Sequence, residues 1–212
     1  MRWVFDLDDT LYLERDFVRS GFHAVEKSTG IPGFFETAWG LFEQGERGDV
    51  FDQALSLLKV PGDVAGMVAV YRAHRPSIAL APDARRLLES IGGAVGLISD
   101  GSAATQQNKL EALGIASRFQ SVVLTGAWGA AYSKPHPRAF LETQRRLGRG
   151  PYIYVADNPT KDFETPRNLG WRTVRVRRQK GLYTATRGVE AEWTVATLDD
   201  VQSVVARGTI RG

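Results

Sequence analysis

Three carboxylates and a hydroxyl follow the first apolar run of this chain. Residues 2–5 (RWVF) predict a short buried strand, and residues 6–10 (DLDDT) come directly after it. Because strand side chains alternate between faces, Asp6 and Asp8 would project to the same side if the strand continued to Asp8. Two neighbouring carboxylates repel each other unless a cation lies between them, so the motif indicates a metal or phosphate site. An acidic turn or helix cap is the alternative, since Asp and Thr also suit those positions.

Three later apolar runs are also followed by residues that could do chemistry. They are Ser99-Asp100-Gly101 after the second run, Lys134 near the third, and Asp157 with Asp162 after the fourth. In an open parallel sheet, ligands bind beyond the carboxyl ends of the strands, so these residues should converge. A hydroxyl, a cation and several carboxylates at one edge predict a single composite site.

Composition limits the class of protein. The chain has 212 residues, a net charge of +3 and 43% hydrophobic residues, which suits one buried core with an inserted subdomain. It has no cysteine, which excludes disulfides and thiolate sites, and its three histidines argue against a His-rich zinc site. No apolar run is long enough to span a membrane, and acidic residues come too early for a signal peptide. We expect a cytoplasmic protein without a membrane partner.

Short apolar runs alternate with amphipathic stretches in the second half of the chain. Strands are expected at residues 94–99, 121–125, 152–156 and 173–176, and helices at 103–113, 137–147 and 161–169. This alternation implies right-handed crossovers and a parallel sheet covered on both faces. The predicted fold class is α/β, with a doubly wound, Rossmann-like parallel sheet.

The segment between the first strand and about residue 81 breaks this alternation. It has helical patterning around residues 17–27, 34–42, 50–58 and 64–74, punctuated by Gly and Pro, and no clear strand. We therefore expect an all-helical insertion. The predicted division is an α/β core of residues 1–12 and 82–212, and a helical cap of residues 13–81.

The motifs resemble those of the haloacid dehalogenase (HAD) superfamily in identity, order and spacing. The resemblance is carried by Asp6-Leu7-Asp8-Asp9-Thr10, by Ser99 closing a strand, by Lys134-Pro135, and by Asp157 with Asp162. It covers nearly the whole chain, because the helical insertion is similar to the first-type (C1) cap. The patterns at 134–137 (KPHP) and 157–163 (DNPTKDF) are similar to those of capped small-molecule phosphatases of subfamily I. Two departures are Ala156, where many relatives have Gly, and Asp100, where relatives often have Asn.

The resemblance implies a magnesium-dependent phosphatase that forms an aspartyl-phosphate. A phosphate monoester dianion repels an anionic nucleophile, so attack by a carboxylate requires a divalent cation and a lysine. Asp6 would be the nucleophile, and Asp8 would first be the general acid and then the base that activates water. For Asp8 to act as an acid near neutrality, its pKa must be raised or its proton held by hydrogen bonds.

The other motif residues have implied binding roles. Mg²⁺ would be bound by the carboxylates of Asp6 and Asp157 and the backbone carbonyl of Asp8. Ser99, the amides of Asp100 and Gly101, and Lys134 would bind the phosphate. Thr10 would orient the Asp8 loop, and Asp162 would hold Lys134 or a metal-bound water.

The cap would determine substrate choice. Arg15, Arg19, His23 and Trp39 are candidates for substrate contacts, although Arg15 and Arg19 lie one helical turn apart and also fit a solvated face. The aromatic residues of the insertion are expected to form its core: Phe17, Phe22, Phe34, Phe35, Trp39, Phe42 and Phe51. The expected partner is a small phosphorylated metabolite, such as a sugar phosphate or nucleoside monophosphate.

Alternatives remain open at this point. A phosphomutase would return the phosphoryl group to a sugar, and a phosphate-binding signalling domain would use similar residues without hydrolysis. Dehalogenation is disfavoured, because it needs neither Asp8 as an acid nor a metal. A nucleic-acid-binding role would rest on the basic cluster at residues 172–180, but we favour a solvated strand edge there and do not expect nucleic acid as a partner. The sequence leaves open the physiological substrate and pathway, and whether the protein is a monomer or a homodimer.

Overall fold

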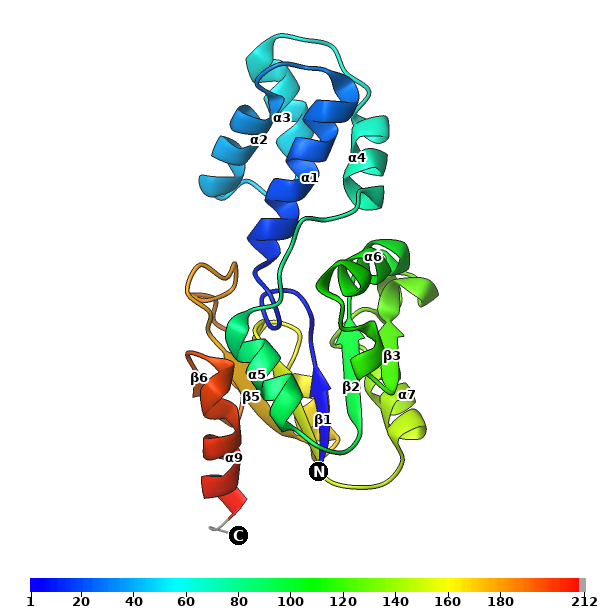
Figure 1. The fold of residues 1–212 in the computed structure, drawn as a ribbon, viewed down its shortest axis with the longest axis vertical. Coiled ribbons are helices and arrows are strands. Elements are labelled where there is room, and N and C mark those ends of the chain that lie inside the picture. Colours follow the sequence, from blue (N-terminus) through cyan, green and yellow to red (C-terminus); the bar gives the residue numbers. More distant parts are fainter. Residues whose placement is uncertain (210–212) are drawn as a thin grey trace. The chain divides into compact units, whose positions relative to one another are not determined.

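Six parallel strands form one sheet with β1 at its centre. The computed structural model describes residues 1–209, and its sheet order is β3-β2-β1-β4-β5-β6. The strands are β1 (Arg2–Phe5), β2 (Val95–Ser99), β3 (Ser121–Leu124), β4 (Tyr152–Ala156), β5 (Arg172–Val176) and β6 (Trp193–Val195). Phe5 pairs with Leu97 on one side and with Val155 on the other. The residues that follow β1, β2 and β4 therefore leave the sheet at one edge (Figure 1).

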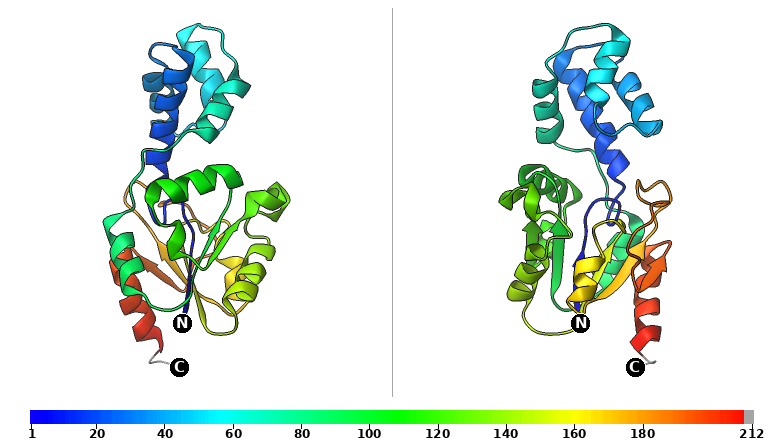
Figure 2. Two further views of the ribbon diagram at one scale, coloured as in Figure 1. Left: turned by 45° about the vertical axis from the view of Figure 1, so that its right-hand side comes forward. Right: turned by 180° about the vertical axis from the view of Figure 1, so that it is seen from behind.

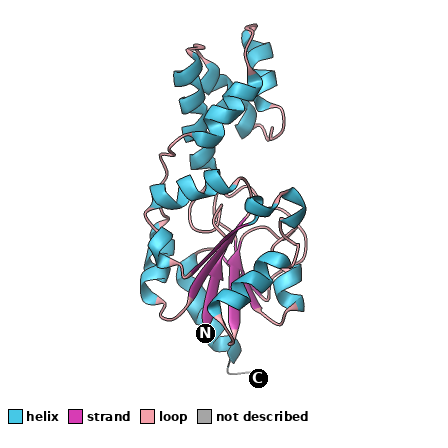
Figure 3. Cartoon of the chain, turned by 90° about the vertical axis from the view of Figure 1, so that its right-hand side faces the viewer, coloured by secondary structure: helices cyan, strands magenta, loops and turns pink. Residues whose placement is uncertain are grey.

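Helices cover both faces of this sheet. They are α5 (Pro82–Ser90), α6 (Ala103–Leu113), α7 (Arg138–Leu147), α8 (Glu164–Asn168) and α9 (Val201–Thr209). Helices α5 and α9 lie on one face and α7 and α8 on the other (Figure 2). Figure 3 shows the strands enclosed between them. Within the described residues, no helix is both long enough and apolar enough to cross a membrane.

Helix α7 is attached to the sheet through a cluster of apolar side chains. Its residue Phe140 is fully buried and meets the rings of Tyr154 and Trp171 edge to face, with centroids 5.2 and 5.6 Å apart. Leu147 packs in the same cluster with Val4 of β1. Burial of such large apolar side chains is the main favourable term that holds the layers together.

Four helices inserted after β1 form the cap. They are α1 (Glu14–Thr29), α2 (Phe34–Glu43), α3 (Val50–Leu58) and α4 (Val64–Ala73). Phe22 packs against Phe34, Phe42 and Phe51 with ring centroids 5.8–6.5 Å apart. The aromatic core predicted for the insertion is confirmed, except that Trp39 is only partly buried.

The chain divides into two compact units. One unit comprises Met1–Glu14 together with the chain from Ala79 onward, and the other comprises Arg15–Ile78. The first contains the sheet and the second the four cap helices.

The predicted fold class is confirmed, and the differences lie in individual elements. The sequence pattern did not predict α5, α9 or the three-residue strand β6. The apolar spacing of Ala84, Leu87 and Leu88 carries a helical signal for α5, whereas β6 is too short for a periodic pattern. Helix α8 begins at Glu164 rather than at residue 161, because the preceding residues form a loop around the side chain of Asp162.

The expected solvated strand edge at residues 172–180 is wrong for the strand and for two of its arginines, although Arg177 and Lys180 are exposed. Strand β5 lies between β4 and β6, so it is not an edge strand. Arg175 is buried, and its guanidinium donates to the carboxylate of Glu190 and to the backbone carbonyl of Tyr183. Arg178 is also buried and donates to the carbonyl of Thr10 at 2.6 and 2.8 Å. These arginines join segments of the core instead of facing solvent.

Arg178 and Asp83 form a buried ion pair that connects α5 to the loop after β1. The Nη1 atom of Arg178 lies 3.0 Å from both Asp83 oxygens, and the amide of Leu198 donates to Asp83 at 2.8 Å. Burial opposes ionisation of Asp83, but the hydrogen bonds from Arg178 and Leu198 hold its pKa below the ordinary value. The pair therefore stabilises the fold at neutral pH, and the contribution is lost as the pH falls through this lowered pKa.

We predict that Asp83→Asn lowers the free energy of unfolding by about 3 kcal/mol at neutral pH, because it leaves the Arg178 charge buried without a counterion. The difference from wild type should begin to shrink below about pH 4, where Asp83 of the unfolded chain binds a proton, and should vanish below the lowered pKa of the folded protein. Urea unfolding at several pH values measures both effects. The exposed pair between Arg86 and Asp199 provides a control, and Asp199→Asn should change stability little. Equal effects of the two variants would contradict the prediction.

Candidate active site

A pocket of about 210 Å³ opens at the carboxyl edge of the sheet. It is lined by Asp6, Asp8, Glu14, Asp100, Gly101, Asp157, Lys161 and Tyr183. Five of these residues belong to the site predicted from the strand ends. Glu14, Lys161 and Tyr183 were not predicted. The remaining predicted core residues, Thr10, Ser99, Lys134 and Asp162, are buried beside the pocket and do not line it.

Asp6 lies directly after β1 and accepts two hydrogen bonds. The Lys134 ammonium lies 2.5 Å from its Oδ1, and the Thr10 hydroxyl donates to its Oδ2 at 3.4 Å. Burial raises the pKa of Asp6 in spite of Lys134, and the nearby Asp162 charge raises it further. Thr10 thus contacts Asp6 itself, in addition to belonging to the loop that carries Asp8.

Lys134 connects the two acidic motifs. Its ammonium is fully buried and lies 2.7 Å from Asp162 and 3.1 Å from the Tyr154 hydroxyl, in addition to its contact with Asp6. Burial disfavours this charge, but Asp162 and Asp6 hold the pKa of Lys134 well above its ordinary value. The second oxygen of Asp162 accepts the amide of Asn158 at 3.0 Å, which fixes the loop after β4. Lys134 is therefore a permanent cation between two carboxylates.

Asp8 is held by three side chains that sequence reasoning missed. Lys109 lies 2.7 Å from its Oδ1, Gln106 donates to its Oδ2 at 2.8 Å, and the Tyr12 hydroxyl also donates to Oδ1. Burial alone would raise the pKa of Asp8, but Lys109 and these hydrogen bonds lower it. Gln106 and Lys109 lie three residues apart on α6 and are both buried. Two polar residues at positions i and i+3 of the helix that follows β2 were the sequence signal that could have indicated contacts with the site.

The loop after β2 carries Ser99, Asp100 and Gly101. The Ser99 hydroxyl is buried and accepts a hydrogen bond from Gln106. The Asp100 carboxylate pairs with Lys161 at 2.9 Å and accepts the backbone amide of Lys134 at 3.1 Å. Gly101 has φ of +98°, a value that favours glycine, so the chain can turn at the pocket wall. The Asp100 charge is thus neutralised by a second lysine of the site.

Asp157 follows β4 and faces the pocket with Asp6. Its pKa is raised strongly by burial and then by the charges of Asp6 and Asp162. In the described part of the chain, no cluster of three or more acidic, His or Cys side chains has the geometry to hold a metal by itself. Two carboxylates, a carbonyl and waters are nevertheless a usual set for Mg²⁺, which keeps several waters. The excess of buried negative charge around Asp6 and Asp157 fits a divalent cation.

Asp9 connects two walls of the pocket. Its carboxylate accepts the backbone amide of Glu14 at 2.9 Å and that of Leu182 at 2.6 Å. Its φ of +51° lies in the left-handed region, which Asp and Asn tolerate better than most residues. Asp9 therefore has a positioning role through its side chain.

The predicted cap residues make contacts with one another and with other cap side chains. Arg15 forms an ion pair with Glu43 and lies over the Trp39 ring, 5.3 Å from its centroid. His23 stacks on Phe35 with centroids 3.5 Å apart, and Arg19 lies 6.0 Å from the centroid of the same ring. Arg19 is exposed, as a solvated face requires, whereas Arg15 is partly buried by its contacts with Glu43 and Trp39.

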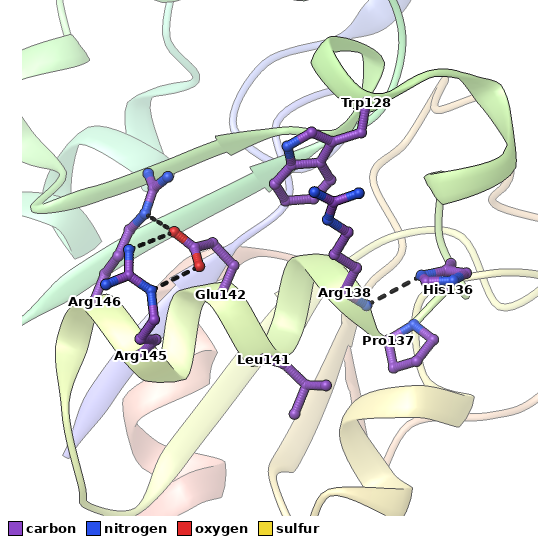
Figure 4. A pocket seen from close by; sticks show the side chains of 8 residues that line it. All are labelled: Trp128, His136, Pro137, Arg138, Leu141, Glu142, Arg145 and Arg146. Atoms are coloured by element: carbon purple, nitrogen blue, oxygen red, sulfur yellow. Dashed lines mark hydrogen bonds and ion pairs between the residues drawn. The ribbon is translucent and has the colours of Figure 1, made fainter.

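A larger groove of about 550 Å³ runs along α7 (Figure 4). The Arg138 guanidinium lies over the Trp128 ring, 4.4 Å from its centroid, and Glu142 pairs with Arg145 and Arg146. None of the predicted site residues lines it. Its size does not make it the reaction site, because it lacks the converging carboxylates and lysine of the smaller pocket.

Comparison with known proteins assigns the family. The haloacid dehalogenase-like hydrolase family matches residues 3–176 of this chain. The chain belongs to this family. The expected HAD hydrolase is thereby confirmed, and the match extends through the cap and as far as the end of β5.

Relatives of this HAD hydrolase include phosphatases. Glyceraldehyde 3-phosphate phosphatase of Methanocaldococcus jannaschii is 27% identical, and the alignment covers 95% of each chain. Phosphoserine phosphatase of Thermus thermophilus is 26% identical over 82% of this chain and 88% of its own. The fold is similar to that of the HAD hydrolase YfnB of Bacillus subtilis in a magnesium-bound structure, with a TM-score of 0.71, 15% identity and coverage of 96% and 97% of the two chains.

The left-handed backbone of Asp9 leads to a stability prediction. Both Asp9→Ala and Asp9→Gly lose the two amide hydrogen bonds. Alanine also has a Cβ, which is unfavourable in the left-handed region of φ, whereas glycine adopts that region without strain. We expect the Ala variant to be less stable than the Gly variant by about 1 kcal/mol in urea unfolding. Asp9→Asn should be the most stable of the three, because its amide oxygen can still accept one bond. Equal stability of Ala and Gly variants would show that φ at this position is not constrained.

Proposed function

We propose that this HAD hydrolase is a Mg²⁺-dependent phosphatase that hydrolyses a small phosphomonoester through an aspartyl-phosphate. The observation that carries the proposal is the contact of buried Lys134 with Asp6, a residue that lines one pocket together with Asp8 and Asp157. A carboxylate nucleophile, a fixed cation and a second carboxylate are the groups that this reaction requires. The phosphatase activities named for the two relatives support the same chemistry.

In the first half-reaction, an Asp6 oxygen forms a bond to phosphorus while the bond from phosphorus to the ester oxygen breaks. Lys134 is already in contact with Asp6, so its charge compensates the negative charge of the phosphoryl group without reorganisation. Lys161 lines the same pocket and adds a second positive charge. In the second half-reaction, water attacks phosphorus and Asp6 is released with inorganic phosphate.

Asp8 handles the proton in both half-reactions. It gives a proton to the leaving oxygen and later accepts one from the attacking water, so its protonation state must alternate. Lys109, Tyr12 and Gln106 favour the ionised form in the free protein, which suits the second step. The negative charge of a bound phosphoester would raise the pKa of Asp8 and favour the protonated form needed for the first.

The residues that would hold Mg²⁺ are Asp6, Asp157 and the backbone carbonyl of Asp8. When bound, the cation would supply positive charge to the nonbridging phosphoryl oxygens and offset the repulsion between them and Asp6. Among the carboxylates that line the pocket, Asp6, Asp8 and Asp100 are each paired with a lysine, whereas Asp157 is in no ion pair within residues 1–209. A phosphate dianion beside Asp6 and Asp157 would be repelled by an ionised Asp157 unless a cation were present.

The substrate belongs to the class of small phosphomonoesters, such as sugar phosphates or nucleoside monophosphates. Arg15, Arg19, His23 and Trp39 remain proposed contacts for its organic part. A phosphomutase would use the same aspartyl-phosphate but return the phosphoryl group to a sugar. We favour hydrolysis because the named activities of both relatives are phosphatase activities.

Replacing the nucleophile tests the proposed chemistry. Asp6→Asn should lower phosphate release from p-nitrophenyl phosphate and from small phosphoesters by at least about 1,000-fold, because an amide is a poor nucleophile. The exposed first-turn residue Glu164 gives a matched acid-to-amide control, and Glu164→Gln should keep wild-type activity. Residual activity of Asp6→Asn near wild type would overturn the assignment. Isomerised sugar phosphate without net phosphate release would instead identify a phosphomutase.

Magnesium should raise the thermal stability of the protein. Millimolar Mg²⁺ should add about 1–3 kcal/mol if the dissociation constant is roughly tenfold to a hundredfold lower than its concentration. The raised pKa of Asp157 means that its negative charge is less favourable in the folded protein than in the unfolded chain. Asp157→Asn should therefore increase the melting temperature of the metal-free protein. The same variant should abolish the rise in melting temperature that Mg²⁺ causes. Thermal denaturation of both proteins with Mg²⁺ or EDTA measures the two effects, with Glu164→Gln again as control. An undiminished rise in Asp157→Asn would place the cation elsewhere.

A further inference from the structure

Two side chains line the pocket without a role in the proposed chemistry. Glu14, the first residue of α1, and Tyr183, in the loop after β5, both face the same space as Asp6 and Asp8. Within residues 1–209, the Glu14 carboxylate and the Tyr183 hydroxyl make no hydrogen bond or ion pair with another side chain or with the backbone. Both side chains are partly exposed and line the pocket, so their polar atoms are available to a bound ligand.

The backbone that carries this pair is held rigidly. The two oxygens of Asp9 accept the amides of Glu14 and Leu182, so one carboxylate positions both walls. Arg175 donates to the carbonyl of Tyr183 at 2.8 Å, and Arg177 donates to that of Thr184 at 2.8 Å. Such support from surrounding hydrogen bonds is typical of binding groups whose geometry matters.

The chemistry of the pair limits the ligand. A carboxylate accepts hydrogen bonds and repels anions, and a phenol hydroxyl can donate or accept. Burial, and then the charge of Asp8, raise the pKa of Glu14 to about 8, so Glu14 carries its negative charge in alkaline solution. The pocket volume of about 210 Å³ is also below the roughly 300–1,000 Å³ that drug-sized ligands occupy.

We propose that Glu14 and Tyr183 form a specificity subsite that selects short phosphomonoesters whose organic part carries a hydroxyl or ammonium donor and no second negative charge. The inference rests on the proposed function, since it concerns the leaving group of the same reaction. Glu14 accepts the donor of the substrate, and Tyr183 contacts the same polar group. A carboxylate or second phosphate on the substrate is excluded by repulsion from ionised Glu14.

Three esters of one chain length test this subsite: glycerol 3-phosphate, propyl phosphate and 3-phosphoglycerate. At about pH 9, where Glu14 is ionised, wild-type kcat/KM should be highest for glycerol 3-phosphate and lowest for 3-phosphoglycerate. Glu14→Gln should reduce the preference for glycerol 3-phosphate over propyl phosphate, and raise the relative kcat/KM for 3-phosphoglycerate, each about tenfold. Tyr183→Phe should reduce only the first preference. Glu164→Gln should leave all three ratios unchanged.

The outcomes separate this inference from the proposed function. Ratios that are equal in wild type and Glu14→Gln, or a wild type that prefers 3-phosphoglycerate, would overturn the subsite while leaving the phosphatase intact. A wild type that hydrolyses p-nitrophenyl phosphate but none of the three esters would also overturn it. If p-nitrophenyl phosphate is not hydrolysed either, the proposed function fails first. If Glu14→Gln does not fold, Tyr183→Phe decides: an unchanged preference for glycerol 3-phosphate over propyl phosphate overturns the subsite.

Discussion

The buried ammonium of Lys134 is the group on which the rest of the site depends. It lies between the carboxylates of Asp6 and Asp162, which come from loops after two neighbouring strands. In a medium of low dielectric, these carboxylates would repel each other strongly, so each requires the cation. The parallel pairing of β1 and β4 places the loops side by side, and Lys134 makes that arrangement electrostatically acceptable.

A second set of buried charges also holds the loop after β1. Arg178 bonds to the carbonyl of Thr10 and to Asp83, while Asp9 bonds to the amides of Glu14 and Leu182. The basic cluster after β5 thus has an architectural role, because two of its arginines tie together segments that are distant in sequence. Through these bonds, the geometry of the pocket and the packing of the core depend on the same residues.

Sequence reasoning was most successful where the signal is local. Strand ends can be located from short apolar runs, and the topology of a parallel sheet brings those ends to one edge, so Asp6, Asp8, Asp100 and Asp157 were placed together in advance. It failed where the deciding contact is distant. Lysine and arginine side chains usually lie at the surface. Nothing in the sequence around Lys109 and Arg178 shows that they are buried in ion pairs with Asp8 and Asp83.

The sequence by itself determined the α/β class, the helical insertion and the residue types available for phosphate chemistry, because hydrophobic periodicity and motif spacing are properties of neighbouring residues. Only the tertiary structure decided the state of each group. It paired Asp8 with Lys109, placed Glu14 and Tyr183 at the same pocket, and brought the charges of Asp157 and Asp6 close together. The physical reason is that burial and electrostatic interactions depend on distances through space, which the order of residues along the chain does not contain.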